Sequence, residues 1–271
     1  MIKQIFISLI HGDLLSTALR KFVNLFNLGS LEFRIECGAF SRSHYMYCIY
    51  NSAKLAKALG LKKISVIEFG CAGGKGLIKL EKYAQLVEKS LQIEIEIYGF
   101  DTGEGLPEPK DYKDLPYHWK SGFFKMDKTK LDVKLQRSKL ILGNVEDTVQ
   151  DFISKVGPAP IGAIMHDLDF YSSTIDSFKL FKGGSEHFLP RVYNYFDDII
   201  GSEIELYNDY TGERLAIEEF NSANPEIKFS HAHHLISRSR KGLVWHHQIR
   251  ILHFLKHHQY NNFISYEDQQ L

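Results

Sequence analysis

Four aspartates stand in two groups in the second half of the chain, each directly after an apolar run. Asp167 and Asp169 form the first group, and Asp197 and Asp198 form the second. If the two runs are neighbouring parallel strands, their carboxyl ends meet at one edge of a sheet. Carboxylates gathered there would raise one another's pKa, which a divalent cation relieves, and an all-oxygen set suits Mg²⁺ better than Zn²⁺. We therefore predict that Asp167, Asp197 and Asp198 bind Mg²⁺. The alternative, which suits Asp169 best, is that these acids cap helices or pair with basic side chains.

A glycine-rich turn is the second feature that could bind a ligand. Glu68 and Gly70 end an apolar run, and Gly73, Gly74 and Gly76 follow before a helical pattern begins. Glycines allow a sharp turn and let a ligand approach the backbone closely. The N-terminus of the following helix favours a carboxylate or a phosphate. The sequence therefore predicts a nucleotide-binding turn between a strand and a helix.

The acid in this turn indicates which ligand it binds. A dinucleotide turn has the pattern G-x-G-x-x-G, which this turn lacks. Glu68 would repel a pyrophosphate, but it suits the cationic end of S-adenosylmethionine, either directly or through water. Asp101 follows the next strand, where an acid commonly holds ribose hydroxyls. The alternatives are a dinucleotide, a turn without a ligand, and an Asp101 that only caps a turn or a helix.

Histidines offer further candidates for proton transfer or metal binding. His166 directly precedes Asp167, and either side chain could act as the base. Because side chains alternate along a strand, His166 could also point away from the site. Eight of the 13 histidines lie between His231 and His258. Adjacent histidines on a strand face opposite sides, so we expect surface positions or acceptor-pocket lining there rather than a shared transition-metal ion.

A long connection at 103–132 interrupts the pattern with three prolines among polar residues. Long connections in compact domains often act as lids. Its aromatic residues Tyr117, Trp119, Phe123 and Phe124 could cover a sugar, because aromatic faces suit sugar rings. The alternative is a small satellite core.

The elements that must position these residues alternate between strand and helix, which is typical of parallel βαβ units. We expect mostly helical structure over residues 1–60, including a short amphipathic helix at Met1–Ile10. The remaining expectations are strands at 64–69, 93–100, 140–142, 161–165 and 191–196, a helix that opens at Ser173, and an antiparallel edge formed by 226–230 and 243–252.

Four motifs in this order resemble the macrocin O-methyltransferase group of sugar O-methyltransferases. They are Glu68-x-Gly70 with Gly73-Gly74, Phe100 to Pro107, Asp167 to Thr174, and Asp197-Asp198. The resemblance covers roughly residues 60–200. It implies the class I methyltransferase fold, a doubly wound, mostly parallel, seven-stranded Rossmann-like α/β sheet with the last strand antiparallel. It also implies magnesium held by Asp167, Asp197 and Asp198, and a hydroxyl acceptor that is often a sugar of a natural product.

These observations predict an N-terminal helical cap at 1–60 and a methyltransferase domain at 61–271 with a lid-like insertion at 103–132. The expected cofactors are S-adenosylmethionine and Mg²⁺, and the expected reaction is O-methylation. The expected cofactor-binding residues are Glu68, Gly70, Cys71, Gly73, Gly74, Asp101, Thr102, Asn144 and Asp167. The rival functions are a non-catalytic module that binds an adenosine-containing ligand and an NAD-dependent sugar dehydrogenase.

Composition narrows the classes of partner. The 271 residues carry 33 basic and 33 acidic side chains, so no basic excess favours nucleic acid. Three cysteines without a C-x-x-C pair indicate a reducing compartment. The apolar start is too short to cross a bilayer. We expect a cytoplasmic enzyme that acts on a small-molecule or glycan acceptor and has neither a nucleic-acid nor a membrane partner; a homodimer is left open.

Overall fold

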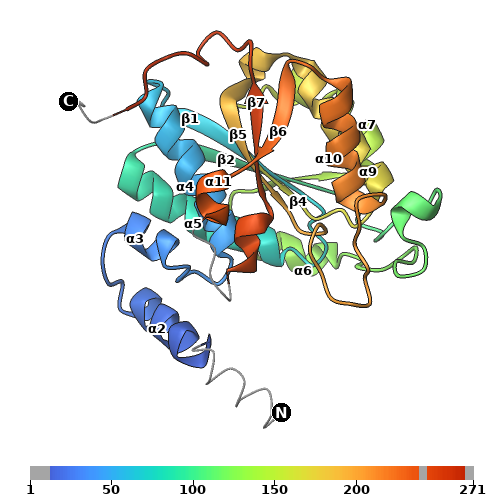
Figure 1. Ribbon diagram of the computed structural model, residues 1–271, viewed down its shortest axis with the longest axis horizontal. Coiled ribbons are helices and arrows are strands. Elements are labelled where there is room, and N and C mark those ends of the chain that lie inside the picture. The colour runs from blue at the N-terminus through green and yellow to red at the C-terminus, as the bar shows by residue number, and fades with distance from the viewer. Residues whose placement is uncertain (1–12, 238–242, 266–271) are drawn as a thin grey trace.

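The computed structural model describes residues 13–237 and 243–265, and its centre is one seven-stranded sheet (Figure 1). The strands lie in the order β3-β2-β1-β4-β5-β7-β6. Their bounds are β1 Lys63–Phe69, β2 Glu94–Asp101, β3 Lys139–Leu142, β4 Ile161–His166, β5 Phe188–Phe196, β6 Ile227–His231 and β7 Ile249–Phe254.

The sheet has the predicted doubly wound order. Strands β1 to β5 pair in parallel, and β7 runs antiparallel to both β5 and β6. The expected antiparallel pair is therefore present, although β7 lies one place inside the edge that β6 forms. Strands β2 and β3 follow on one side of β1, whereas β4 and β5 follow on its other side, so the switch point lies between β1 and β4. Ligands of such sheets bind beyond the carboxyl ends of the strands at this point.

Helices cover both faces of the sheet (Figure 1). Helices α4 and α5 lie on one face, and α7, α9 and α10 lie on the other. The α-helices are α2 Asp13–Leu25, α3 Leu31–Glu36, α4 Ser43–Ala58, α5 Lys75–Leu91, α6 Lys128–Asp132, α7 Val145–Gln150, α8 Phe152–Val156, α9 Tyr171–Ser177, α10 Gly212–Ala223 and α11 His233–Ile236. The 3-10 helices are η1 Tyr112–Asp114, η2 Phe178–Gly183, η3 Ser185–His187 and η4 Val244–His247.

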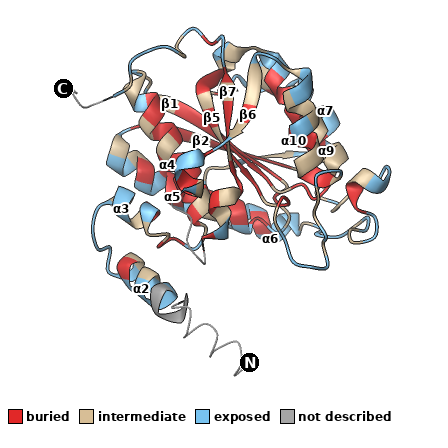
Figure 2. Cartoon of the chain, in the orientation of Figure 1, coloured by how far each residue is buried: buried red, intermediate tan, exposed pale blue. Residues whose placement is uncertain are grey.

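The core consists of two apolar layers, one on each face of the sheet (Figure 2). Strands β1 and β4 are buried along almost their whole length, as central parallel strands covered by helices must be. On α5 the predicted helical face is buried, with Leu80, Tyr83, Ala84 and Val87 against the sheet. These two layers hold the strand ends in fixed positions around the switch point.

Two local predictions were wrong. The helix between β4 and β5 begins at Tyr171 with Phe170 as its N-cap, so Ser173 lies inside it. The earlier start follows from a tertiary contact, because Asp169 donates its backbone N–H to Asp198 and holds the preceding turn. In the expected strand 243–252, the first part is the 3-10 helix η4, where Trp245 packs against Tyr47 of α4 at 5.6 Å between ring centroids.

The N-terminal part is helical, as expected. Helix α4 packs against β1, β4 and β5, whereas α2 extends away from the sheet (Figure 1). The proposed division into a cap at 1–60 and a methyltransferase domain at 61–271 stays a prediction. The expected helix at Met1–Ile10 lies outside the described residues. Within the described ranges, no helix is long and apolar enough to span a membrane.

The connection at 103–132 folds over the carboxyl end of the sheet and is anchored there. Asp114 is fully buried and accepts hydrogen bonds from the backbone N–H of Lys110 at 2.8 Å and of Ser172 at 2.8 Å, as well as from the Ser172 hydroxyl at 2.9 Å. At its far side, the Tyr117 hydroxyl donates to the carbonyl oxygen of Glu205 at 2.6 Å. The connection is thus tied both to α9 and to the loop that follows β5.

Candidate active site at the carboxyl end of the sheet

A cavity of about 650 Å³ lies at the switch point, between the strand ends and the 103–132 connection. Both predicted groups of residues open into it. Those that line it are Glu68, Gly70, Cys71, Gly73, Asp101, Thr102, Asn144, Asp167, Asp197 and Asp198. Gly74 does not line it; this residue precedes α5 with φ +72°, and Leu131 packs against its backbone. The structure therefore brings the glycine turn and the aspartates together in one space.

Glu68 is a buried carboxyl at the inner end of this cavity. Its Oε1 accepts a hydrogen bond from the Tyr45 hydroxyl at 2.7 Å, while Oε2 is buried and has no partner among the residues that the structure describes. Burial raises the pKa of Glu68 to about 7, although the Tyr45 hydrogen bond and the Arg42 charge act in the opposite direction. A buried oxygen without a partner is costly, so this position suits a ligand that donates hydrogen bonds or carries positive charge.

Two glycines are required by close approaches at this point. Gly70 has φ +80°, and a Cβ there would lie 1.7 Å from the carbonyl oxygen of Asp167. A Cβ at Gly76 would lie 1.6 Å from Oε1 of Glu68. Gly70 thus lets β1 and β4 converge, and Gly76 leaves room for the Glu68 carboxyl between α5 and the cavity.

Asp101 holds the shape of the glycine turn. Its Oδ2 accepts from the backbone N–H of Cys71 at 2.9 Å and of Ala72 at 2.8 Å, and its Oδ1 accepts from Gly103 at 2.6 Å. These bonds explain how Ala72 keeps a positive φ of 44°. Asp101 also lines the cavity. Its role in binding ribose hydroxyls stays a prediction.

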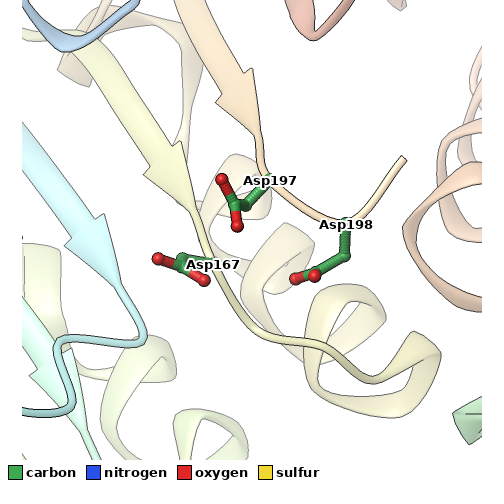
Figure 3. Close-up of side chains that lie close together, drawn as sticks. All are labelled: Asp167, Asp197 and Asp198. Carbon is green, nitrogen blue, oxygen red and sulfur yellow. The ribbon is translucent and has the colours of Figure 1, made fainter. Parts of the chain in front are cut away.

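The aspartates converge as predicted (Figure 3). Asp167 follows β4, Asp197 and Asp198 follow β5, and one carboxylate oxygen from each lies within 4.8 Å of the others. Burial and the charges of Asp197 and Asp198 hold the pKa of Asp167 well above its usual range. Burial and the Asp197 charge raise the pKa of Asp198 to about 7. Among the described residues, no basic side chain forms an ion pair within 4.0 Å of these three aspartates, and a bound cation would supply the missing charge.

Asp197 and Asp198 differ in how they are held. Asp198 accepts hydrogen bonds from the Asp169 backbone N–H at 2.9 Å and from the Tyr207 hydroxyl at 2.8 Å, and its own N–H donates to Glu213. Asp197 is bonded through its side chain to the Tyr195 hydroxyl. Asp198 is therefore also a structural residue, whereas Asp197 is the more exposed of the two.

His166 does not reach the cavity, which corrects its assignment as a candidate base. It is fully buried on the other face of β4, stacked on Phe196 at 4.4 Å between centroids. Its ring nitrogens lie 3.2 Å from Asn194 Oδ1 and 3.3 Å from the Ser177 hydroxyl. Burial lowers the pKa of His166 to about 3. The alternation of side chains along the strand places Asp167 at the site and His166 in the core.

The aromatic and histidine predictions are resolved in part. Trp119 and Phe124 line the cavity, with their rings 5.7 Å apart, and Tyr117 and Phe123 do not. The histidines between His231 and His258 do not line it, and His231, His233, His234 and His258 are exposed, as the surface alternative predicted. Within residues 13–237 and 243–265, the aspartate cluster is the one group with metal-binding geometry.

Arg42 is a site residue that the sequence did not reveal. It precedes α4 and lines the cavity, with its guanidinium carbon 4.8 Å from the centroid of the Tyr45 ring. Burial by itself would lower its pKa, but Tyr45, Glu68, Asp167 and Asp197 together raise it. No motif marks Arg42, because it reaches the site only through the packing of α4 on the sheet.

Known structures were compared with this one. The calicheamicin methyltransferase CalS11 matches with a TM-score of 0.52 and 19% identity, over 90% of this chain and 93% of that chain. The O-methyltransferase NovP matches with a TM-score of 0.47 and 14% identity, over 67% of this chain and 72% of that chain. Searches against protein-family models and curated protein sequences give no match. At this identity the likeness to CalS11 concerns the fold, and it confirms the class I methyltransferase fold that the motifs implied.

Proposed function

We propose that this protein is an S-adenosylmethionine-dependent O-methyltransferase that acts on a sugar or another hydroxyl acceptor with the help of Mg²⁺. The observation that carries the proposal is the convergence of two groups in one cavity. The glycine turn with its buried Glu68 opens into the same space as Asp167, Asp197 and Asp198. The first group suits a cationic nucleotide-like donor, and the second suits a hard cation that binds hydroxyl oxygens.

The carboxylates fit Mg²⁺ by their chemistry. All three offer oxygen, and Asp167 and Asp198 carry raised pKa values because negative charge gathers there. Asp167, Asp197 and Asp198 would hold the ion. When bound, Mg²⁺ would supply Lewis acidity that lowers the pKa of an acceptor hydroxyl.

The chain's own residues would align the two substrates and receive the proton. A sulfonium methyl is already activated, so catalysis rests on in-line placement and on deprotonation of the acceptor. Glu68 and the turn at Gly70 would hold the donor, and Trp119 would cover the acceptor with its indole face. We assign Asp167 as the group that takes the acceptor proton, since it lies where the two halves of the cavity meet.

The expected partners follow from the same cavity. Its aromatic and acidic lining suits a small-molecule or glycan acceptor. Cys37, Cys48 and Cys71 are all unpaired, which agrees with a reducing compartment, and we propose the cytoplasm.

Donor binding and turnover test the proposal. Isothermal titration calorimetry would measure affinities for S-adenosylmethionine, S-adenosylhomocysteine and NAD, each with and without Mg²⁺. We expect binding of the first two and none of NAD. Methyl transfer from isotopically labelled donor to a panel of sugars and glycosides, with Mg²⁺ present and then chelated, would identify the acceptor class.

The outcomes separate the rival functions. Binding of NAD alone would favour a dehydrogenase and remove the methyltransferase proposal. Donor binding without transfer to any hydroxyl acceptor would favour a module that senses an adenosine-containing ligand. Transfer that persists at full rate after chelation would discard the role of Mg²⁺ while leaving the methyltransferase assignment in place.

A further inference from the structure

Basic side chains gather outside the catalytic cavity, where β6 ends and β7 begins. The register of this antiparallel pair places His231 directly opposite Arg250. Residues in such positions point to the same face of the sheet and lie close together. The ring of His233 follows, 5.9 Å from that of His231 between centroids. These three residues do not line the catalytic cavity, so the site already described does not account for them.

Arg250 keeps donors that the chain does not use. Its Nη1 donates to the backbone carbonyl oxygens of His247 at 2.6 Å and Ile249 at 3.1 Å, which holds the guanidinium at the start of β7. Within residues 13–237 and 243–265, its side chain makes no other hydrogen bond and has no acidic partner within 4.0 Å. A guanidinium presents several N–H donors in a planar fork that matches a phosphate or a carboxylate. The donors of Nε and Nη2 are therefore available to an anion.

Arg214 brings a further cation to the same face of the sheet. Arg250 points to the face that α10 covers, because Leu252, two residues further along β7, belongs to the core layer of that face. Arg214 lies on α10, which packs beside β6 (Figure 1). Its acidic partner is Asp209, whose side chain is 73% exposed. An ion pair this exposed is weak, so Arg214 still acts on its neighbours.

The electrostatics of the group agree with this geometry. Burial, and after it the charge of Arg214, lower the pKa of Arg250 to about 10. Burial also lowers the pKa of His231, and the charges of Arg250, His233, His247 and Arg214 add to the effect. These basic groups repel one another, and a bound anion would relieve that repulsion.

We propose that Arg250, His231 and Arg214 form a binding site for a phosphate group, separate from the catalytic cavity. The free donors of Arg250 bind the phosphate oxygens, and His231 and Arg214 supply charge around them. A phosphate suits this site better than a carboxylate, because it carries more charge and offers more acceptor oxygens to cations on several sides. The group belongs either to free phosphate or to a phosphorylated sugar. The site does not depend on the proposed methyltransferase function.

Isothermal titration calorimetry of the metal-free protein with inorganic phosphate tests the proposal. We expect Arg250→Met to weaken phosphate binding about 10-fold to 100-fold, the range for hydrogen bonds between charged groups. His231→Gln removes an exposed charge and should weaken binding about threefold. Because His231 is exposed, this variant keeps the fold. If Arg250→Met does not fold, His231→Gln decides, and unchanged affinity in that variant overturns the proposal.

Two further variants serve as controls. His258→Gln removes another exposed histidine, which stacks on His257 at 4.4 Å beyond the end of β7. Lys75→Met removes a cation of the catalytic cavity. Both should leave the affinity for phosphate unchanged. Loss of phosphate binding in Lys75→Met but not in Arg250→Met would place the anion in the cavity and overturn the proposal, as would a lack of phosphate binding by the unchanged protein.

Glucose 6-phosphate separates the two sources of the phosphate group. Tighter binding of this probe than of inorganic phosphate, lost in Arg250→Met, assigns the site to a phosphorylated sugar. The opposite order of affinities, with the same loss, assigns it to free phosphate. Since no methyl donor enters the measurement, the phosphate site and the methyltransferase proposal can fail separately.

Discussion

At the scale of single residues, the glycine turn and the aspartates could be predicted because their chemistry is local. Glu68 and Gly70 form one short motif, and the pair Asp197 and Asp198 ends one strand. Arg42 and Tyr45 could not be predicted, because they lie before β1 in the chain and reach the site only when α4 packs on the sheet. Sequence patterns show what a strand end carries, but not which distant helix completes it.

Gly76 offers a test of the Glu68 carboxyl without changing it. In Gly76→Ala the new Cβ would lie 1.6 Å from Glu68 Oε1, so the carboxyl must move. We expect affinity for S-adenosylhomocysteine to fall at least about 10-fold, since a charge-assisted contact is worth on the order of 2 kcal/mol. Overpacking costs about 1–3 kcal/mol, and the helix propensity of alanine offsets about 1 kcal/mol of it, so the melting temperature should fall by a few degrees. Gln85→Ala is the control, because Gln85 is an exposed residue of the same helix α5 and does not line the cavity. Equal losses in both variants would contradict the role given to Gly76.

Asp197 offers a test of the cation site. Asp197→Asn keeps an oxygen that can accept the Tyr195 hydrogen bond but removes one charge from the cluster. Because Asp197 raises the pKa of both Asp167 and Asp198, the metal-free variant should be more stable, by about 1 kcal/mol. Differential scanning fluorimetry should show a higher melting temperature without metal and no further rise with Mg²⁺. The control is Asp209→Asn, because Asp209 is an exposed acid that pairs with Arg214. A Mg²⁺ response of normal size in Asp197→Asn would remove Asp197 from the site.

At the scale of elements, the positions of the strands could be predicted from apolar runs in the sequence, but the residue at which α9 begins could not. The start of α9 was placed too late because Asp198, from another strand, fixes the turn before it. Likewise the place of β7 between β5 and β6 depends on register between distant segments. Both features are tertiary in origin, so a reading of local pattern could not supply them.

The connection at 103–132 should open when its buried anchor is removed. Asp114→Ala leaves the backbone N–H groups of Lys110 and Ser172 without their acceptor. Unpaired buried donors cost about 1–3 kcal/mol, so the connection should exchange amide hydrogens faster. Hydrogen-exchange mass spectrometry over this segment is the measurement. The matched control is Asp111→Ala, which removes the exposed N-cap of η1. It should alter amide exchange only near Lys113. Unaltered protection in Asp114→Ala would show that other contacts hold the connection down.

At the scale of the whole molecule, balanced charge conceals an uneven distribution. The chain has equal numbers of acids and bases, 33 of each, yet buried acids gather at one end of the sheet. Glu68, Asp167, Asp169, Asp198 and Glu213 all have raised pKa values, chiefly through burial. The composition could not show this, because it counts charges without placing them. The fold has concentrated destabilising charge where the proposed ligands bind, which is common at functional sites.

This concentration predicts a pH dependence whose sign can be derived. Burial raises the pKa of Glu68 from 4.5 to about 7 and that of Asp198 from 3.8 to about 7. The folded chain then holds protons that the unfolded chain has already released, so stability falls as pH rises through the folded pKa. Histidines with lowered pKa values, such as His44 and His166 at about 3, act in the opposite direction below pH 6.5. Between about pH 7 and 8 these histidines are largely neutral in both states, and the acids determine the slope.

Urea unfolding of the metal-free protein at intervals from pH 7 to 8 should therefore show a falling free energy of unfolding, by about 1 kcal/mol per pH unit. Glu68→Gln removes one of the titrating groups and should reduce the slope. Mg²⁺ should reduce it as well, because the ion binds the deprotonated carboxylates and stabilises the folded state more as pH rises. Because the Glu68 charge also raises the pKa of Asp167, the two changes should be coupled rather than additive. A free energy of unfolding that rises over this range would mean that the buried acids are already compensated by contacts within the chain, and the case for a cation among them would be lost.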